Sequence, residues 1–93
     1  MSEEEKRIPK TFPKEIPNYY INSVSITSSI YDFMFTFGLK SEPSLDPEPI
    51  AIIRMSPHHA KVFSKVFSKN VKSYEEKVGE IILPEDLRKE LEV

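Results

Sequence analysis

An apolar strand that runs directly into a capped helix constrains the fold of this chain most. The apolar run Ile50–Met55 is followed by Ser56 and Pro57. Serine is a preferred N-cap, and proline suits the first helical position because no hydrogen bond needs its missing N–H there. Apolar residues then recur at steps of three and four, which predicts a helix to about Val78 with a left-handed end at Gly79: Ala60, Phe63, Phe67, Val71, Tyr74 and Val78.

Two further strands are predicted upstream of this unit. Residues Tyr19–Ser28 alternate between apolar and small hydroxyl side chains, and Asp32–Gly38 places Phe33, Phe35 and Phe37 on one face. The connection between these two runs is too short for a crossover, so they should form an antiparallel hairpin. A proline-rich loop over residues 38–49 should lead to the third strand.

The expected fold is α+β, with a small antiparallel sheet of three or four strands packed by one long helix as a two-layer sandwich. We expect an extended, flexible arm over residues 1–18, a β-β-β-α core domain over 19–79, and a C-terminal extension over 80–93. Within the extension, 80–83 should be a short strand or extended return, and 84–91 a short helix. A core of this size is thin, so we expect a homo-oligomer, most simply a dimer.

Composition excludes several classes of protein. The 93 residues contain no cysteine, so neither disulfides nor thiolate metal sites exist. No apolar run approaches the length of a membrane span, and the N-terminus has no secretory signal, so we expect a cytoplasmic protein that does not enter membranes. The net charge of -2 disfavours a dedicated nucleic-acid protein.

No catalytic or metal-binding motif stands out. The adjacent His58 and His59 would point about 100° apart on a helix and cannot chelate one ion well. The hydroxyl run Ser23–Ser29 has no base marked beside it, and ion pairs with Lys72 and Lys77 explain Glu75 and Glu76. We therefore expect no enzyme activity, no cofactor and no metal.

One helix face could contact nucleic acid. Lys61, Lys65, Lys69 and Lys72, here named the Lys stripe, lie opposite the Phe face, and residues 56–79 carry five Lys against two Glu. Tyr19, Tyr20 and Tyr31 lie in or beside the hairpin and could stack on bases. A solvated helix face and packed tyrosines are the commoner meanings of these patterns.

The chain resembles domain-of-unknown-function family 3467, a group of small, mostly bacterial proteins. The resemblance rests on Tyr20-Ile-Asn22-Ser-Val-Ser, on Tyr31-Asp32-Phe33 before an alternating strand, on Arg54-Met55-Ser56-Pro57-x-x-Ala60-Lys61, and on Tyr74-Glu75-x-x-x-Gly79. It spans residues 19–79 and supports the domain boundaries. It implies no activity and no catalytic residues.

The order of strands followed by one helix also resembles the PUR repeat and Whirly-like architecture, whose members dimerise and bind single-stranded nucleic acid on their sheets. This chain has three clear strands where a PUR repeat has four, and its sheet carries few basic residues. Two hypotheses therefore stand: a non-enzymatic, oligomeric interaction or scaffold module, and a single-stranded nucleic-acid-binding module that uses the Lys stripe. The partner in the first is a second copy or another protein, whereas nucleic acid is a partner only in the second.

Overall fold

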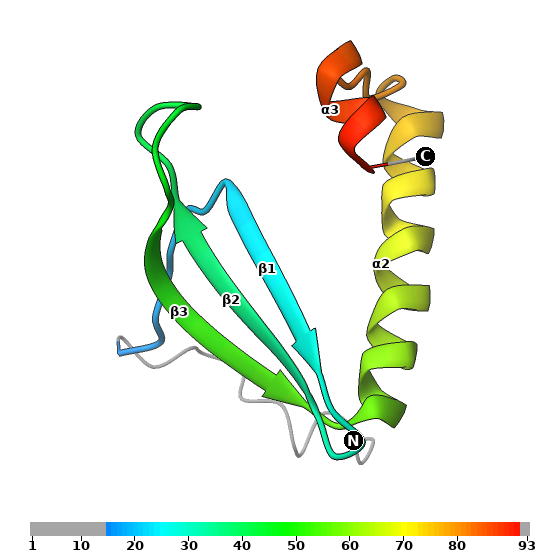
Figure 1. Ribbon diagram of the computed structural model, residues 1–93. Helices are drawn as coiled ribbons and strands as arrows, with labels where there is room; N and C mark the ends of the chain where they lie inside the picture. Colours follow the sequence, from blue (N-terminus) through cyan, green and yellow to red (C-terminus); the bar gives the residue numbers. More distant parts are fainter. Residues whose placement is uncertain (1–14, 92–93) are drawn as a thin grey trace. The chain divides into compact units, whose positions relative to one another are not determined.

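A computed structural model describes residues 15–91 of the chain. These residues form three strands and two helices, in the order β1 (Ser23–Ser28), β2 (Phe33–Leu39), β3 (Glu48–Met55), α2 (Pro57–Lys77) and α3 (Glu85–Leu91) (Figure 1). The expected α+β class, with its strands first and its long helix after them, is confirmed. Most of the arm expected over residues 1–18 lies outside the described residues.

The three strands form one antiparallel sheet in the order β1-β2-β3, so that β2 is central (Figure 1). Neighbouring residues of a strand point to opposite faces. On one face, the Arg54 guanidinium Nη2 lies 3.7 Å from the Met34 sulfur. On the other, the rings of Phe35 and Phe37 stack with their centroids 6.1 Å apart. The alternation predicted for β2 therefore separates an aromatic face from a mixed one.

A serine-centred turn joins β1 to β2. The Ser29 amide donates to the Asp32 carbonyl at 2.9 Å, and the Ser29 hydroxyl oxygen accepts from the amides of Tyr31 and Asp32 at 3.0 and 3.2 Å. Serine side chains often stabilise turns in this way. The tight hairpin expected from the short connection follows from these local bonds.

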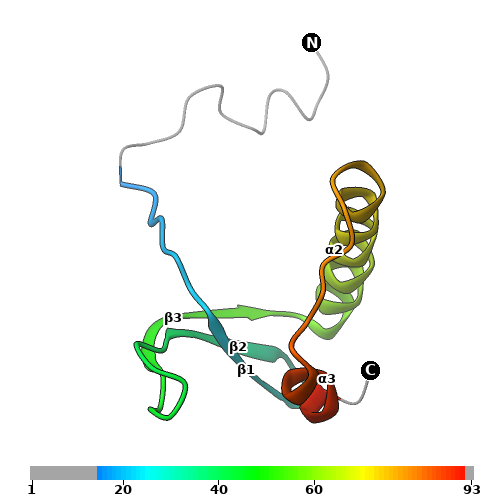
Figure 2. The ribbon, with the colours of Figure 1, turned by 90° about the horizontal axis from the view of Figure 1, so that it is seen from above.

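Strand β1 begins at Ser23, so the prediction that it starts at Tyr19 is wrong. Asn22 precedes this start: its backbone amide still donates to the Gly38 carbonyl at 3.1 Å, and its side chain bonds to Lys40. Its Nδ2 donates to the Lys40 carbonyl at 3.1 Å, and its Oδ1 accepts from the Lys40 amide at 2.8 Å. Residues 15–22 form neither helix nor strand, and Figure 2 shows the chain leading up to β1 in an extended course.

The loop between β2 and β3 is shorter than residues 38–49, because β3 begins at Glu48 instead of Ile50. Gly38 makes the close approach of the two strands possible. A Cβ atom at this position would lie 2.9 Å from the Glu48 carbonyl oxygen and 3.1 Å from the Pro47 Cβ. Only glycine leaves room for β3 to start this early.

The start of α2 agrees with its sequence signals. Ser56 is the N-cap, with its side chain accepting from the His59 amide at 3.1 Å, and Pro57 occupies the first helical position. The helix then runs for 21 residues without an interruption.

The end of α2 lies where the sequence predicts it. The C-cap Val78 keeps a right-handed conformation, and its amide donates to the Tyr74 carbonyl at 2.8 Å. Gly79 follows with a positive φ of 154°, which residues with a side chain rarely adopt, so glycine is needed at this stop. This φ is larger than the αL value near 57°. Residues 80–84 form no strand, and the expected short helix is present as α3.

The described residues fall into two compact units, one made of residues 15–26 and 35–53 and the other of 27–34 and 54–91. Phe35 in the first unit and Ala60 in the second are the hydrophobic residues of the described chain that are buried. Each unit thus has little interior of its own.

We predict that Ser56→Ala destabilises the protein by about 1 kcal/mol, because the His59 amide loses its capping oxygen. Ser56→Asp keeps an acceptor at the N-cap and is the matched control. Chemical denaturation followed by circular dichroism measures both. Equal stability of the alanine variant and the natural protein would contradict the capping role.

Candidate functional site

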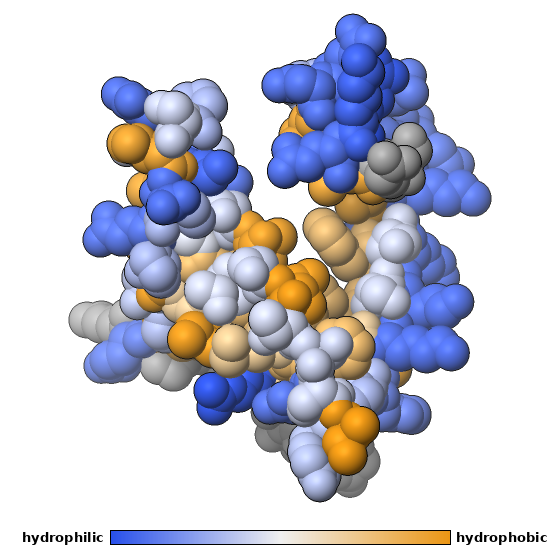
Figure 3. All heavy atoms as spheres, in the orientation of Figure 1, coloured by the Kyte–Doolittle hydropathy of each residue, from blue (hydrophilic) through white to orange (hydrophobic). Residues whose placement is uncertain are grey.

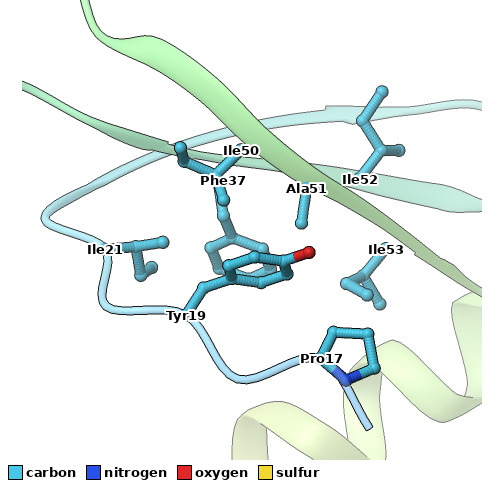
Figure 4. A pocket seen from close by; sticks show the side chains of 8 residues that line it. All are labelled: Pro17, Tyr19, Ile21, Phe37, Ile50, Ala51, Ile52 and Ile53. Carbon is cyan, nitrogen blue, oxygen red and sulfur yellow. The ribbon is translucent and has the colours of Figure 1, made fainter. Parts of the chain in front are cut away.

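An apolar pocket of about 580 Å³ lies on the aromatic face of the sheet. Its walls come from the chain that precedes β1 and from strands β2 and β3, with this lining: Pro17, Tyr19, Ile21, Phe37, Ile50, Ala51, Ile52 and Ile53. In Figure 4 the side chains of Phe37, Ala51 and Ile53 extend toward the ring of Tyr19, whereas Ile52 extends away from it. Residues before β1 therefore lie across this part of the sheet.

The chemistry of this pocket is that of an apolar contact surface. The Tyr19 hydroxyl is the polar side-chain group among its lining residues, which include no carboxylate, amine, imidazole or thiol. Catalysis by acid, base or nucleophile needs at least one such group held in place. The pocket can take up apolar groups, and it offers little else.

The apolar face of α2 forms a second surface. The rings of Phe63 and Phe67 stack with centroids 5.8 Å apart. Their exposed fractions are nonetheless 39% and 58%, and Tyr74, further along the helix, is 49% exposed. The helical spacing predicted for this face is present, and much of its area remains uncovered in the single chain.

The chain folds back on α2 just after the helix ends. The Ile81 amide donates to the Glu75 carboxylate at 2.9 Å, and Ile81 lines a groove of about 250 Å³ with Phe67, Val71 and Tyr74. The ion pairs expected for Glu75 and Glu76 are absent from residues 15–91, where the one ion pair joins Lys89 to Glu85 at 4.0 Å. Glu75 thus fixes the exit of the chain from the helix.

The Lys stripe is exposed along α2, as predicted, because its four residues recur at helical spacing away from the aromatic side chains. Figure 3 shows polar side chains gathered along one side of this helix. The three tyrosines proposed to stack on bases have different surroundings. Tyr19 lines the pocket, Tyr20 is 82% exposed, and Tyr31 is in the β1–β2 turn. They form no common platform with the Lys stripe within either unit.

Of the remaining candidate site residues, some have a local structural role and the others have no role that the structure shows. His58 and His59 are exposed in the first turn of α2, and no group of three or more metal-ligating side chains exists within residues 15–91. Of the hydroxyl run, Ser29 serves the turn, where its hydroxyl lies 3.3 Å from the Asp32 carboxylate. The remaining members are strand residues of β1.

Sequence reasoning missed the roles of Asn22 and of the segment from Pro17 to Tyr19. The predicted alternation places Asn22 inside a strand over residues 19–28, where it is a polar interruption, and it assigns Pro17 to the flexible arm. That polar interruption was the available signal for Asn22, since a short amide side chain favours backbone hydrogen bonds outside regular strands.

We predict that Tyr19→Ala lowers stability by about 1 kcal/mol, because the ring, although Tyr19 is 58% exposed, lies over apolar side chains of β2 and β3. Tyr19→Phe keeps the ring that lines the pocket and is the matched control, so it should leave stability unchanged. Urea unfolding midpoints measure the difference. A midpoint for the alanine variant equal to that of the natural protein would show that the ring does not cover this face.

Comparison with known proteins adds family membership. Neither helix of the described chain combines the length and the hydropathy needed to cross a membrane. Neither a curated protein nor a solved structure matches the chain. One family model, described as a protein of unknown function (DUF3467), matches residues 2–83, which is most of the sequence and extends beyond the resemblance noted over residues 19–79. The chain therefore belongs to family DUF3467, proteins of unknown function.

Proposed function

We propose that this protein is a non-enzymatic, homo-oligomeric interaction module, most simply a homodimer with two-fold symmetry. The observation that carries the proposal is the amount of apolar surface that the single chain leaves uncovered. Large hydrophobic side chains are exposed on every strand and on α2, for example Ile26 at 53%, Ile52 at 55% and Phe67 at 58%.

Scattered apolar residues are normal on a protein surface, but rows of them are not. Along α2 and its C-cap, apolar residues recur at steps of three and four and form one continuous stripe, which is exposed Phe63 and Phe67, half-buried Val71, and exposed Tyr74 and Val78. Packing on the sheet of this chain and association with a second copy can both remove such a stripe from water, and neither needs a second gene product. Removing apolar surface from water contributes roughly 25 cal/mol per Å².

The two-layer sandwich is part of this proposal. The aromatic face of β2, with Phe33, Phe35 and Phe37, is covered in part by the chain before β1, whereas the apolar face of α2 is largely exposed. We assign them to each other, with a second copy completing the cover where one chain is insufficient. Both faces already carry stacked ring pairs, at 6.1 Å on β2 and 5.8 Å on α2, which favours aromatic packing between them.

An interaction role without catalysis agrees with the chemistry of the surfaces. The pocket on the sheet is lined by apolar side chains, and the side chains of Ser29, Ser56 and Glu75 each accept a hydrogen bond from a backbone amide. Groups that are committed to turns and caps are not free to act as nucleophiles or bases.

The test is the mass of the protein in solution. Light scattering at micromolar concentration should return twice the chain mass of 10.8 kDa. Phe67→Asp should return the chain mass or unfold, because it puts a charge into the apolar stripe. Lys65→Asp, on the opposite side of α2, is the control and should leave the dimer intact. A natural protein with a mass of 10.8 kDa would refute the proposal.

Single-stranded nucleic-acid binding is the second candidate function, favoured by the exposed Lys stripe and a net charge of +3 over residues 56–79, from five Lys and two Glu. Residues 80–93 oppose it, since they carry five acidic side chains against two basic ones. Acidic groups repel a phosphate backbone.

We therefore expect weak or no binding of an unstructured oligonucleotide at about 0.15 M salt, where surface charges are strongly screened. Fluorescence anisotropy with a labelled single strand measures this. Sub-micromolar binding that is abolished by changing Lys61, Lys65 and Lys69 to Glu would reverse our order of the two functions.

A further inference from the structure

The two edges of the sheet differ in how well they are protected against pairing with another strand. Because the order is β1-β2-β3, strands β1 and β3 each leave one edge unpaired within the described residues. Natural edge strands usually carry proline or charged residues that discourage pairing. β3 has Pro49, Glu48 and Arg54, whereas β1 has neither a proline nor a charge.

Strand β1 has the composition of a strand that is paired. It consists of β-branched and small hydroxyl residues, which are favourable neighbours across a ladder. Val24 and Ile26 are 51% and 53% exposed, although β2 already flanks one edge of this strand. A strand edge without such protection can pair with a strand of another chain. We therefore expect a specific strand to pair with the free edge of β1.

Symmetry selects the register if that strand belongs to a second copy. A two-fold axis perpendicular to the sheet leaves each face of the sheet pointing the same way in both copies. Two antiparallel β1 strands related by such an axis therefore have one residue that lies directly opposite its own copy, and the axis passes beside that residue. With the axis at Ser25, Val24 lies opposite Ile26 of the partner subunit, and Ser23 lies opposite Thr27 of the partner subunit. Over residues 23–27, apolar residues then meet apolar ones and hydroxyls meet hydroxyls, while Ser28 lies opposite Asn22 of the partner subunit.

Neighbouring choices of the axis match less well. With the axis at Ile26, Val24 would lie opposite Ser28 of the partner subunit, which mixes apolar and hydroxyl residues. An axis at Val24 would place Asn22 opposite Ile26 of the partner subunit, which pairs an amide with an apolar side chain. The absence of charge in β1 matters here too, because a charged residue near the axis would face its own copy.

We propose that β1 is the edge at which two copies of this chain join, antiparallel about a two-fold axis at Ser25, so that the two sheets become one continuous sheet. This inference rests on the proposed homodimer and assigns its symmetry axis. The β3 edge is the competing site. Its own pairing about Ala51 would place Glu48 opposite Arg54 of the partner subunit, but Pro49 would leave a ladder position without its N–H.

Single-cysteine variants test the assignment, because the natural chain has no cysteine and any disulfide must join two copies. Opposite residues in an antiparallel pair have Cα atoms about 4.5 or 5.5 Å apart, and both distances suit a disulfide. Ser25→Cys should therefore form a covalent dimer on mild oxidation. Ser23→Cys should not, because four residue steps, about 13 Å along the strands, separate it from its copy. Ala51→Cys tests the β3 edge in the same way.

A mixture of Ser23→Cys and Thr27→Cys proteins should give the mixed disulfide, which checks the register. The same samples are weighed by light scattering under reducing conditions. Covalent dimer from Ser25→Cys but not from Ser23→Cys or Ala51→Cys supports the inference. A non-covalent dimer in which Ser25→Cys forms no more disulfide than Ser23→Cys overturns the β1 assignment but not the homodimer, as does selective crosslinking of Ala51→Cys. A monomer overturns both.

Discussion

The interior of this small chain is too limited for the apolar side chains that its strands and helix carry, and the other features of the structure depend on that imbalance. A domain of about 60 residues buries only about 60% of the surface of its unfolded chain. Within residues 15–91, Phe35 and Ala60 are the buried hydrophobic residues, while aromatic and branched side chains on β1, β3 and α2 stay exposed. The elements are well formed because local hydrogen bonds hold their ends. The chain does not bury the apolar faces of those elements completely.

Local signals explain why much of the fold could be predicted. The N-cap of α2 needed only Ser56, Pro57 and the helical spacing that follows, and the hairpin needed only two alternating runs and a short connection. The start of β1 was mispredicted because Asn22 acts at a distance. Its side chain bonds to Lys40, 18 positions away, and no local pattern reveals that partner. The end of α2 at Gly79 is a local signal and was predicted, whereas the bond of the Ile81 amide to Glu75 that follows it was not.

The same distinction applies to the candidate surfaces. The Lys stripe and the apolar face of α2 follow from helix periodicity and are present where the sequence placed them. The pocket could not be predicted, since it arises when residues 17–21 lie across strands that are about 30 positions later in the chain. The pairing pattern of β1 was visible as an alternation, but its meaning depended on knowing that β1 is an edge strand and β2 the central one.

If exposed apolar faces are covered by a second copy, folding and association are one equilibrium, and the stability of the protein depends on its concentration. The most direct measurement is the thermal unfolding midpoint over a hundredfold range of protein concentration, followed by circular dichroism. The account predicts that the midpoint rises steadily with concentration, as it does for a dimer that unfolds to separate chains. A reversible midpoint that stays the same over the whole range would contradict it, because the single chain would then be stable without a partner.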